Sequence, residues 1–360
     1  MSVVKIDVKE LQPGNGYQLP PEAYTTQEWL EREEKFLFAS GWNFVCTTDD
    51  LPSPGSYHSV QIGKYPIVLV RGDDGIIRGF HNICRHRGAK MLDDSGTCTR
   101  LKCPYHFWQY TLKGELVSVP QGKQQFPEMD KSDWGLRTVD IGVWMGMIFV
   151  NPDGKAEPFD DWLGSVRGLL DDYRLDELKQ LVKVEYIFDS NWKFYIENHI
   201  DWYHLWYTHK ETLGVLDHTS GKMQQIGKHW LSWEPFRKPG EQKLPFKPLQ
   251  GLSEQNKQNG AHLLFPNLTI FGGESWFGTG LITPVGPNQA QMSFRLWALP
   301  DQDPDEFMKG FHQVTQVEDA EMAARMQLGV NSPVFKVGPL TKEYEQPITE
   351  FHDNYVRMMG

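Results

Sequence analysis

Two short segments, each holding one cysteine and one histidine, constrain this chain more than any other feature of its sequence. They read Cys84-x-His86 and Cys103-x-x-His106. Each segment puts a thiolate and an imidazole on a short loop, and the stretch between them is long enough for strands that bring the loops together. A structural zinc ion and a [2Fe-2S] cluster with two histidines in place of two cysteines both use such a set. Zinc pairs usually hold two cysteines or two histidines, so the mixed composition of each segment favours the cluster.

A second group of candidate ligands lies in an aromatic-rich segment that is predicted to be a helix over residues 190–209. Asp201 and His204 are three residues apart and would share a helix face. His209 is rotated from His204 by about 140° on a regular helix, so both reach one metal only if the helix kinks or ends between them. Two histidines and a carboxylate on one face are a common Fe(II) site for O₂ chemistry. Any of these residues taken alone is better explained as a polar residue of the helix, which is the role expected for His199.

The size and composition of the chain suit two domains or one large one. It has 360 residues, enough for more than one simple core. A net charge of -11 without a basic cluster argues against a nucleic-acid partner. No apolar run approaches the roughly 20 residues of a membrane helix, and the N-terminus lacks the apolar stretch of a signal peptide. The few cysteines fit a reducing, cytoplasmic setting, with Cys46 and Cys98 as ordinary buried or half-buried thiols.

The order of the predicted elements indicates an α+β protein. Residues 21–40 form a predicted helix that Thr25 or Thr26 can cap. Short strands follow up to residue 150, including a hairpin that joins 65–70 to 76–77 through a turn rich in glycine and aspartate. Beyond a turn at 151–154, the predictions are a helix over 158–182, a strand over 183–189, a polar excursion or flexible loop over 237–259, strands within 262–298 and a helix over 304–328.

The first two segments closely resemble the cluster-binding motif of Rieske proteins. Arg87-Gly88 in the first and Pro104-Tyr105 in the second are similar to the version found in ring- and alkyl-hydroxylating oxygenases. Respiratory Rieske proteins carry an extra cysteine in each loop, joined as a disulfide, and that pair is absent here. Phe107 departs from the family, which commonly has glycine after the second histidine. The resemblance implies a [2Fe-2S] cluster whose ligands are Cys84, His86, Cys103 and His106.

The later group resembles the motif Asn-x-x-Asp-x-x-His-x₄-His in the catalytic domain of the same oxygenases. The positions that match are Asn198, Asp201, His204 and His209. The resemblance implies that both histidines bind a mononuclear Fe(II), with a third ligand on a downstream helix that ends in Gln-x-Gly. Asp319 is the predicted third ligand. Helical periodicity places Glu318 nearer the apolar line of that helix, so the choice of Asp319 rests on the resemblance.

Asp201 has a different role in this family, because it hydrogen-bonds to a ligating histidine and to a cluster histidine of the neighbouring subunit. The resemblance thus implies a head-to-tail homotrimer in which electrons pass from His106 of one subunit to Asp201 of the next. A carboxylate bonded to a ligating imidazole is also expected around a metal. Asn198 joins Asp201 as a catalytic candidate. The implied electron source is an NAD(P)H-dependent flavin reductase, acting directly or through a ferredoxin.

The resemblance covers essentially the whole chain and implies how its parts are arranged. A small all-β Rieske domain would be inserted into a larger mixed domain, whose antiparallel sheet is flanked by helices. The expected boundaries are 1–41 for an N-terminal helical segment that packs on the catalytic domain, 42–152 for the Rieske domain and 153–360 for the catalytic domain.

The substrate is constrained less sharply than the reaction class. Four aromatic residues flank the proposed ligands and could wall a flat ring, cage a quaternary ammonium by cation–π attraction or belong to the core: Trp202, Tyr203, Trp206 and Tyr207. Chain length and the pair Glu197-Asn198 resemble the subgroup that oxidises betaines and choline, whereas His209-Lys210 departs from its usual His-Pro. We therefore expect O₂-dependent hydroxylation or oxidative N-dealkylation of a small polar amine.

Three alternatives stay open at the level of sequence. One is an oxygenase that hydroxylates aromatic rings or aromatic acids. Another is a Rieske-type electron carrier without oxygenase activity, which the length of the chain disfavours, since one domain of typical size would suffice. The third is a zinc-stapled binding protein. Metal analysis separates an oxygenase from the last two.

Overall fold

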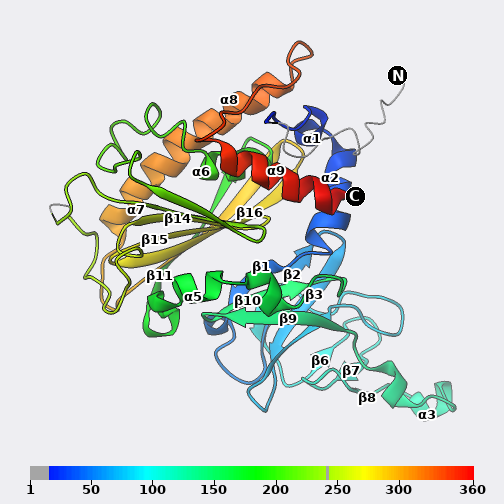
Figure 1. Ribbon diagram of the computed structural model, residues 1–360. Helices are drawn as coiled ribbons and strands as arrows, with labels where there is room; N and C mark the ends of the chain where they lie inside the picture. Colours follow the sequence, from blue (N-terminus) through cyan, green and yellow to red (C-terminus); the bar gives the residue numbers. More distant parts are fainter. Residues whose placement is uncertain (1–15, 241–242) are drawn as a thin grey trace. The chain divides into compact units, whose positions relative to one another are not determined.

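The structure is a computed structural model that describes residues 16–240 and 243–360, and the chain divides into two units (Figure 1). The smaller unit is Glu34–Asp161. The larger unit combines the described residues up to Glu33 with Trp162–Gly360, so the smaller unit is inserted into it. The antiparallel sheets and helices confirm the predicted α+β class. The predicted boundaries at 41/42 and 152/153 both fall within the smaller unit.

Two antiparallel sheets build the smaller unit. The first has the strand order β1 (Asn43–Thr47), β10 (Met147–Asn151), β9 (Thr138–Trp144), β4 (Ile77–His81), β3 (Tyr65–Arg71), β2 (Ser56–Ile62) and β5 (Ser95–Thr97). The predicted hairpin is confirmed, because β3 and β4 pair from Arg71↔Ile77 onward. The second sheet has the order β6 (Leu101–Lys102), β7 (Gln109–Tyr110) and β8 (Leu116–Ser118). Alternate residues of β3, Val68 and Val70, pack in the core that also contains both candidate cluster cysteines.

One antiparallel sheet forms the centre of the larger unit. Its strand order is β11 (Lys179–Phe188), β17 (Gln289–Ala298), β16 (Trp276–Gly286), β15 (Leu268–Gly273), β14 (Asn259–Leu264), β13 (His229–Glu234) and β12 (Lys222–Ile226). Helix α6 (Trp192–Ile200) packs on β14, β16 and β17, and both α8 (Ala320–Val330) and α9 (Gln346–Met359) pack against α6 (Figure 1). Every residue of α6 except His199 is buried, as expected for a helix that is covered on all sides.

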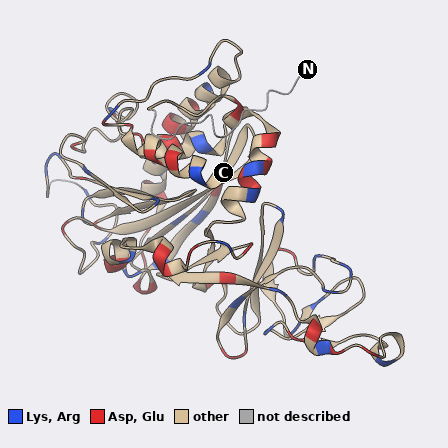
Figure 2. Cartoon of the chain, turned by 45° about the vertical axis from the view of Figure 1, so that its right-hand side comes forward, with Lys and Arg blue, Asp and Glu red and all other residues tan. Residues whose placement is uncertain are grey.

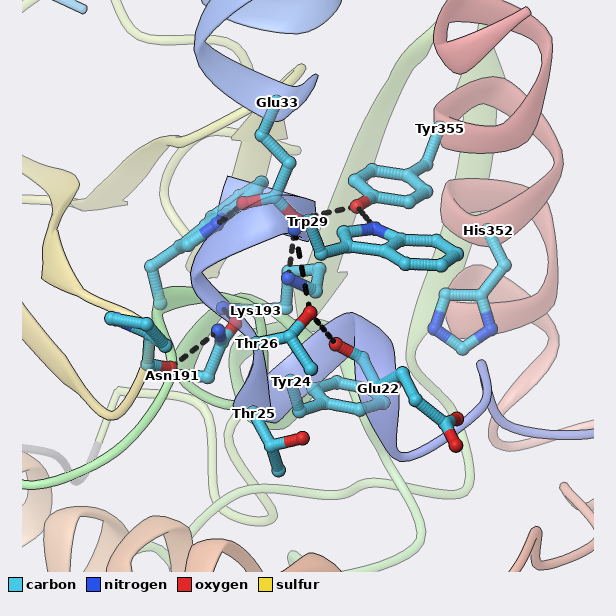
Figure 3. A network of polar contacts seen from close by, with 12 residues as sticks. Glu22, Tyr24, Thr25, Thr26, Trp29, Glu33, Asn191, Lys193, His352 and Tyr355 are labelled. Carbon is cyan, nitrogen blue, oxygen red and sulfur yellow. Dashed lines mark hydrogen bonds and ion pairs between the residues drawn. The ribbon is translucent and has the colours of Figure 1, made fainter. Parts of the chain in front are cut away.

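A buried polar network fixes α6 to the N-terminal and C-terminal helices of the larger unit (Figure 3). Lys193 on α6 lies 2.5 Å from Glu33, at the end of α2 (Gln27–Glu33). Tyr355 on α9 donates a hydrogen bond to Glu33 and accepts one from the indole of Trp29 at 2.5 Å. Trp192 donates to the second carboxylate oxygen of Glu33 at 2.8 Å. Because a buried charge is costly without partners, these bonds hold α6 to α2 and α9.

Several predicted helices are shorter in the structure. Residues 21–40 contain α1 (Glu22–Thr25), α2 and a π-helical turn η2 (Glu34–Phe38), and the Thr26 hydroxyl accepts the Trp29 N–H at 3.3 Å. The prediction of a helix over 158–182 was wrong in its second half. Only α4 (Phe159–Leu163) and α5 (Val166–Leu170) are α-helical there, and β11 begins at Lys179.

The predicted helix over 190–209 stops early, whereas the one over 304–328 is nearly continuous. Helix α6 ends at Ile200, and Asp201 has extended backbone angles. The downstream helix comprises α7 (Asp305–His312), the π-helical segment η7 (Gln313–Asp319) and α8. Both departures lie at the candidate iron ligands.

The polar stretch before β14 was predicted as an excursion or flexible loop. Its described residues hold no helix or strand, but several of them are buried, including Leu249 and Leu252. Asn256 accepts a hydrogen bond from Trp233 at 2.9 Å and donates one to the Leu169 carbonyl at 2.7 Å. The described part of this stretch is thus packed against the larger unit rather than free of it.

Charges of both signs are interspersed over both units, in agreement with the sequence, which has no basic cluster (Figure 2). Among the described helices, none combines the length and the apolar composition that are needed to cross a membrane. All four cysteines are free thiols, with Cys46 buried and Cys98 half-buried, as predicted.

Candidate metal centres

Two matching turns present the four candidate cluster ligands. The first turn follows β4 and the second joins β6 to β7. In each, the cysteine carbonyl accepts an N–H from the turn: Gly88 donates to Cys84 at 3.0 Å and Phe107 donates to Cys103 at 3.1 Å. The backbone therefore repeats the same local geometry at both cysteines.

The four side chains converge as a [2Fe-2S] cluster requires. Cys84 and Cys103 are buried in one apolar core, and burial raises the pKa of the Cys84 thiol. The rings of His86 and His106 lie 4.7 Å apart between their centres. The Nδ1 atom of His86 is buried without a hydrogen-bond partner. A cluster with both cysteines on one iron and both histidines on the other fits this arrangement. The two thiols are buried, the two imidazoles lie side by side, and one ring nitrogen lacks a partner.

Tyr110 is a neighbour of these ligands that the sequence did not reveal. Its hydroxyl lies 3.4 Å from the sulfur of Cys84 and accepts the Arg85 N–H at 3.0 Å. Hydrogen bonds to cluster sulfurs are among the factors that set the reduction potential. The only signal in the sequence was a tyrosine on the short strand after the second motif.

The candidate iron ligands come together just beyond the end of α6. Asp319 Oδ1 lies 2.8 Å from His209 Nε2 and 3.6 Å from His204 Nε2. The two Nε2 atoms are 3.1 Å apart. Apart from the cluster ligands, these three residues are the group in the described part of the chain whose ligand atoms lie close enough to share one metal ion. Asp319 Oδ1 is buried without a satisfied hydrogen bond, so the donor set fits a 2-His-1-carboxylate Fe(II) site.

The carboxylates and imidazoles of this site shift one another's pKa values. Burial opposes a charge on His204, but Asp201 and Asp319 together raise its pKa to about 9. Burial likewise opposes a charge on Asp319, yet both histidines lower its pKa to about 2. The aspartates thus favour protonated histidines, and the histidines favour ionised aspartates, at one buried point. A divalent cation can bind there in place of the histidine protons.

Asp201 and Glu318 each lie behind one histidine. Asp201 Oδ2 is 3.3 Å from His204 Nδ1. Glu318 Oε2 is 2.6 Å from His209 Nδ1 and accepts the Thr212 hydroxyl at 2.7 Å. Carboxylates on the far nitrogen of a ligating histidine fix the orientation of its ring. Glu318 therefore lies outside the group and Asp319 inside it, an arrangement that α-helical periodicity could not predict because both residues lie in the π-helical segment.

A cavity of about 450 Å³ opens onto His204, His209 and Asp319. Asn198, a catalytic candidate from the sequence, and Trp202, a candidate for the substrate wall, both line it. Most of its aromatic wall comes instead from residues that the sequence analysis missed: Phe271, Trp276, Phe307 and Phe311. They belong to β15, β16 and α7, far from the ligands in sequence, and no local pattern connects them with the site.

Three of the four aromatic residues that were predicted to flank a substrate lie outside the lining of this cavity. Tyr203 is exposed, and Tyr207 is 74% exposed. Trp206 packs edge-on against Tyr344, with ring centres 4.7 Å apart. The prediction paired these residues on a helix, but the helix ends at Ile200, so helical spacing does not apply to them.

His199 has the structural role that was expected of it. Its Nε2 lies 3.0 Å from the His262 carbonyl oxygen, and its ring meets the edge of Phe271 at 4.9 Å. Burial lowers its pKa to about 4. A neutral His199 thus forms part of the cavity wall next to the ligand group.

Two family models match the chain. The ring hydroxylating alpha subunit (catalytic domain) model matches residues 175–360, and the Rieske [2Fe-2S] domain model matches residues 41–138. The glycine betaine monooxygenase oxygenase subunit of Chromohalobacter salexigens is 27% identical, over 94% of this chain and 85% of that protein. The chloroplastic choline monooxygenase of Spinacia oleracea is 25% identical, over 95% of this chain and 78% of that protein.

Solved structures share the fold. A quaternary ammonium Rieske monooxygenase superposes with a TM-score of 0.84 at 20% identity, over 100% of each chain. Naphthalene 1,2-dioxygenase from Rhodococcus sp. superposes with a TM-score of 0.77 at 23% identity, over 95% of this chain and 94% of that one. The family matches confirm the predicted cofactors, a Rieske [2Fe-2S] cluster and a non-heme iron, and the predicted class of oxidoreductase. The chain belongs to the ring hydroxylating alpha subunit family and is an oxygenase of the Rieske type.

Proposed function

We propose that this chain is the terminal oxygenase that hydroxylates a carbon atom next to the nitrogen of a small N-methylated amine or quaternary ammonium compound. The observation that carries the proposal is the aromatic-walled cavity, which ends at the His204, His209 and Asp319 group. Aromatic faces attract alkylated ammonium groups by cation–π interaction. The glycine betaine and choline monooxygenases among its relatives support this class of substrate.

The reaction balances with one O₂ and one reduced nicotinamide per turnover. One oxygen atom enters a C–H bond of the N-methyl group, and the other leaves as water after two electrons and two protons are added. The resulting N–CH₂OH group breaks down to formaldehyde and the demethylated amine. The two electrons come from NAD(P)H through a flavin reductase, directly or by way of a ferredoxin.

In this proposal, His204, His209 and Asp319 hold the mononuclear iron, while Cys84, His86, Cys103 and His106 hold the cluster. When bound, the cluster supplies single electrons and the iron supplies the activation of O₂. Asp201 and Glu318 orient the two imidazoles from behind. Trp276 and Phe307 hold the substrate against the ligand group and exclude water from it.

We assign Asn198 to the same machinery, as a neutral hydrogen-bonding group in the cavity wall. We further propose that the cluster domain comprises 42–152 and the catalytic domain 153–360, with 1–41 as the N-terminal segment that packs on the catalytic domain. The free cysteines are compatible with a reducing, cytoplasmic setting.

We further propose a homotrimer in which His106 of one subunit meets Asp201 of the next. Both residues lie next to exposed aromatic side chains. Tyr105 and Phe107 flank His106, and Tyr203 follows Asp201 closely. Aromatic residues are enriched at protein interfaces, where they combine apolar area with a polar edge. Asp201 could then bridge the two metal sites of neighbouring subunits through hydrogen bonds.

Loading, electron transfer and product analysis test the proposal together. The protein is purified anaerobically, assayed for iron, sulfide and zinc, and supplied with reductase, NADH and a panel of N-methyl compounds. The proposal predicts about three irons per chain, a rhombic EPR signal on reduction and formaldehyde in step with O₂ uptake. Zinc in place of iron, or oxidation of N-methyl compounds no faster than without the protein, contradicts it.

Hydroxylation of an aromatic ring is the second candidate, because the same aromatic wall could enclose a flat ring by stacking. The same assay separates the two candidates. Ring hydroxylation would give hydroxylated or dihydrodiol products and no formaldehyde. A panel that includes benzoate and biphenyl decides between them.

A further inference from the structure

The cavity above the ligand group has a one-sided balance of charge. Its described lining contains the carboxylates of Asp201, Glu234, Glu306 and Asp319. No lysine or arginine is among the described residues that line it. Lys309 lies three residues beyond Glu306 on α7, where it is exposed to solvent and pairs with Glu306 at 3.6 Å. When the iron is bound, its two charges are matched by Asp201 and Asp319. Beyond the iron, a ligand meets the carboxylates of Glu234 and Glu306 and aromatic faces, and no lysine or arginine among the described lining residues.

Glu234 is the carboxylate that stands out, because it is buried and far from the ligand group in sequence. It ends β13, and its side chain is only 5% exposed. Its Oε1 lies 2.6 Å from Nδ1 of His218, which is also buried and meets the edge of Trp206. A buried carboxylate is costly unless it is paired or hydrogen-bonded. His218 satisfies one oxygen of Glu234, and Glu234 is among the residues that line the cavity.

The aromatic wall provides a second, independent feature that favours a cation. The rings of Trp276 and Phe307 meet edge to face, with centres 4.7 Å apart. Phe311 continues the wall, with its ring centre 6.1 Å from that of Phe307 and 5.6 Å from that of Phe271. Such a set of rings attracts an ammonium group without a hydrogen bond, which suits a nitrogen that carries methyl groups instead of protons.

A carboxylate on a substrate held by the aromatic wall would find no lysine or arginine among the described lining residues. Neutral groups such as the Asn198 amide could donate a hydrogen bond to one of its oxygens, but they offer no positive charge against Glu234. Repulsion between like charges in a water-poor cavity is stronger than in water. For a zwitterion of the betaine type, repulsion of the carboxylate would thus offset the attraction of the ammonium group.

We propose that the cavity selects a substrate with one positive charge and no carboxylate, such as an N-methylated amino alcohol, and that Glu234 is its counter-charge. This inference rests on the proposed function and narrows its substrate class. It assigns to Glu234 and its partner His218 the discrimination between cations and zwitterions, a role for which the metal-binding motifs give no indication.

The test compares two ligands that differ only at the group in question. Choline and glycine betaine share a trimethylammonium group, and a CH₂OH in the first replaces the carboxylate of the second. Binding to the metal-loaded protein is measured anaerobically by calorimetry, so that no turnover occurs. We expect choline to bind at least about tenfold more tightly than glycine betaine, which corresponds to about 1.4 kcal/mol. Tighter binding of glycine betaine overturns the inference and leaves the proposed function intact.

Glu234→Gln tests the assigned residue. It should weaken choline binding about tenfold and leave glycine betaine binding unchanged or improved, because it removes the counter-charge and keeps the shape. Glu321→Gln, which removes an exposed carboxylate from α8, is the matched control and should change neither constant. If the folded Glu234→Gln protein keeps the wild-type preference for choline over glycine betaine, Glu234 does not have the proposed role. If neither ligand binds the wild-type protein and no N-methyl compound is oxidised, both this inference and the proposed function are wrong.

Discussion

Phe107 has a backbone conformation that side chains other than glycine rarely adopt. Its φ is 58°, and its ring is 50% exposed beneath the ammonium group of Lys102, 4.3 Å away. The family commonly has glycine at this position, and the positive φ supplies the physical reason. Strain that is kept at a functional site usually serves that site. Here it presents an exposed ring next to His106.

Replacing Phe107 by glycine should relieve this strain. We expect Phe107→Gly to raise the free energy of unfolding of the smaller unit by up to about 1 kcal/mol, since the left-handed region costs a side chain more than it costs glycine. The same change should weaken the proposed trimer, because it removes exposed aromatic area. Denaturant titration followed by the colour of the cluster measures the first effect, and sedimentation measures the second. Lower stability would show that the ring is held by packing rather than strained.

Glu318 and Asp319 are neighbours with different expected roles. Asp319→Asn should remove the mononuclear iron and leave the cluster unchanged, because it takes away the one carboxylate inside the group. Glu318→Gln should keep the iron but weaken its affinity by about 10–100-fold, the usual effect of losing a partner behind a ligating histidine. Iron content after dialysis against a graded chelator distinguishes the two. If Glu318→Gln lost all its iron and Asp319→Asn kept it, Glu318 would be the iron ligand and Asp319 would not.

At the scale of elements, sequence patterns predicted regular structure better than they predicted its interruptions. The β3–β4 hairpin follows from alternation of apolar residues and a turn rich in glycine and aspartate, both of which are local. The end of α6 at Ile200 is not local, since Trp202 donates its N–H to the Tyr344 carbonyl, far along the chain, at 3.1 Å. The π-helical segment η7 likewise has no signature in the sequence. Both interruptions occur where the ligands need positions that an α-helix does not provide.

The residues of the candidate site likewise divide into those that the sequence could predict and those that it could not. The motifs point to the two cysteines and four histidines because the spacing within each motif is nearly fixed, whereas the choice of Asp319 rested on the resemblance to the family. Trp276, Phe307 and Glu234 were missed, because β13, β16 and α7 come together only through the order of strands in the sheet. Ligands that share a short segment can therefore be predicted from their spacing, whereas the shape of a cavity depends on the tertiary fold.

The buried Glu33–Lys193 pair connects three helices, and its loss should destabilise the larger unit (Figure 3). Burial lowers the pKa of Lys193, and the charge of Glu33 acts against this shift. Glu33→Gln should cost about 3–5 kcal/mol of unfolding free energy, because it leaves a buried ammonium without its counter-charge. Urea titration of the single variants and of Glu33→Gln/Lys193→Met measures the coupling.

The double variant should lose clearly less than the sum of the single variants, because it leaves no charge unpaired. Glu321→Gln, which breaks an exposed pair with Arg325, is the control and should cost about 0.5 kcal/mol or less. A loss of similar size in Glu33→Gln and in this control would mean that the buried network contributes little to holding α6.

At the scale of the whole molecule, the proposed electron transfer requires more than one copy of the chain. Each chain carries both ligand groups, one in each unit. The proposed path nevertheless runs from the cluster of one subunit to the iron of the next. A head-to-tail ring makes every such pair equivalent, so each site in a trimer has one donor.

Complementation between two inactive variants tests this claim most directly. Cys84→Ser removes the cluster from one chain, and Asp319→Ala removes the iron from another. Each variant alone should be inactive. When both are co-expressed and assemble at random, about one quarter of wild-type activity per chain should return, since half the chains keep the iron and half of their neighbours keep the cluster. Recovered activity in purified mixed trimers supports transfer between subunits, whereas mixed trimers that contain both metals and remain inactive would contradict it.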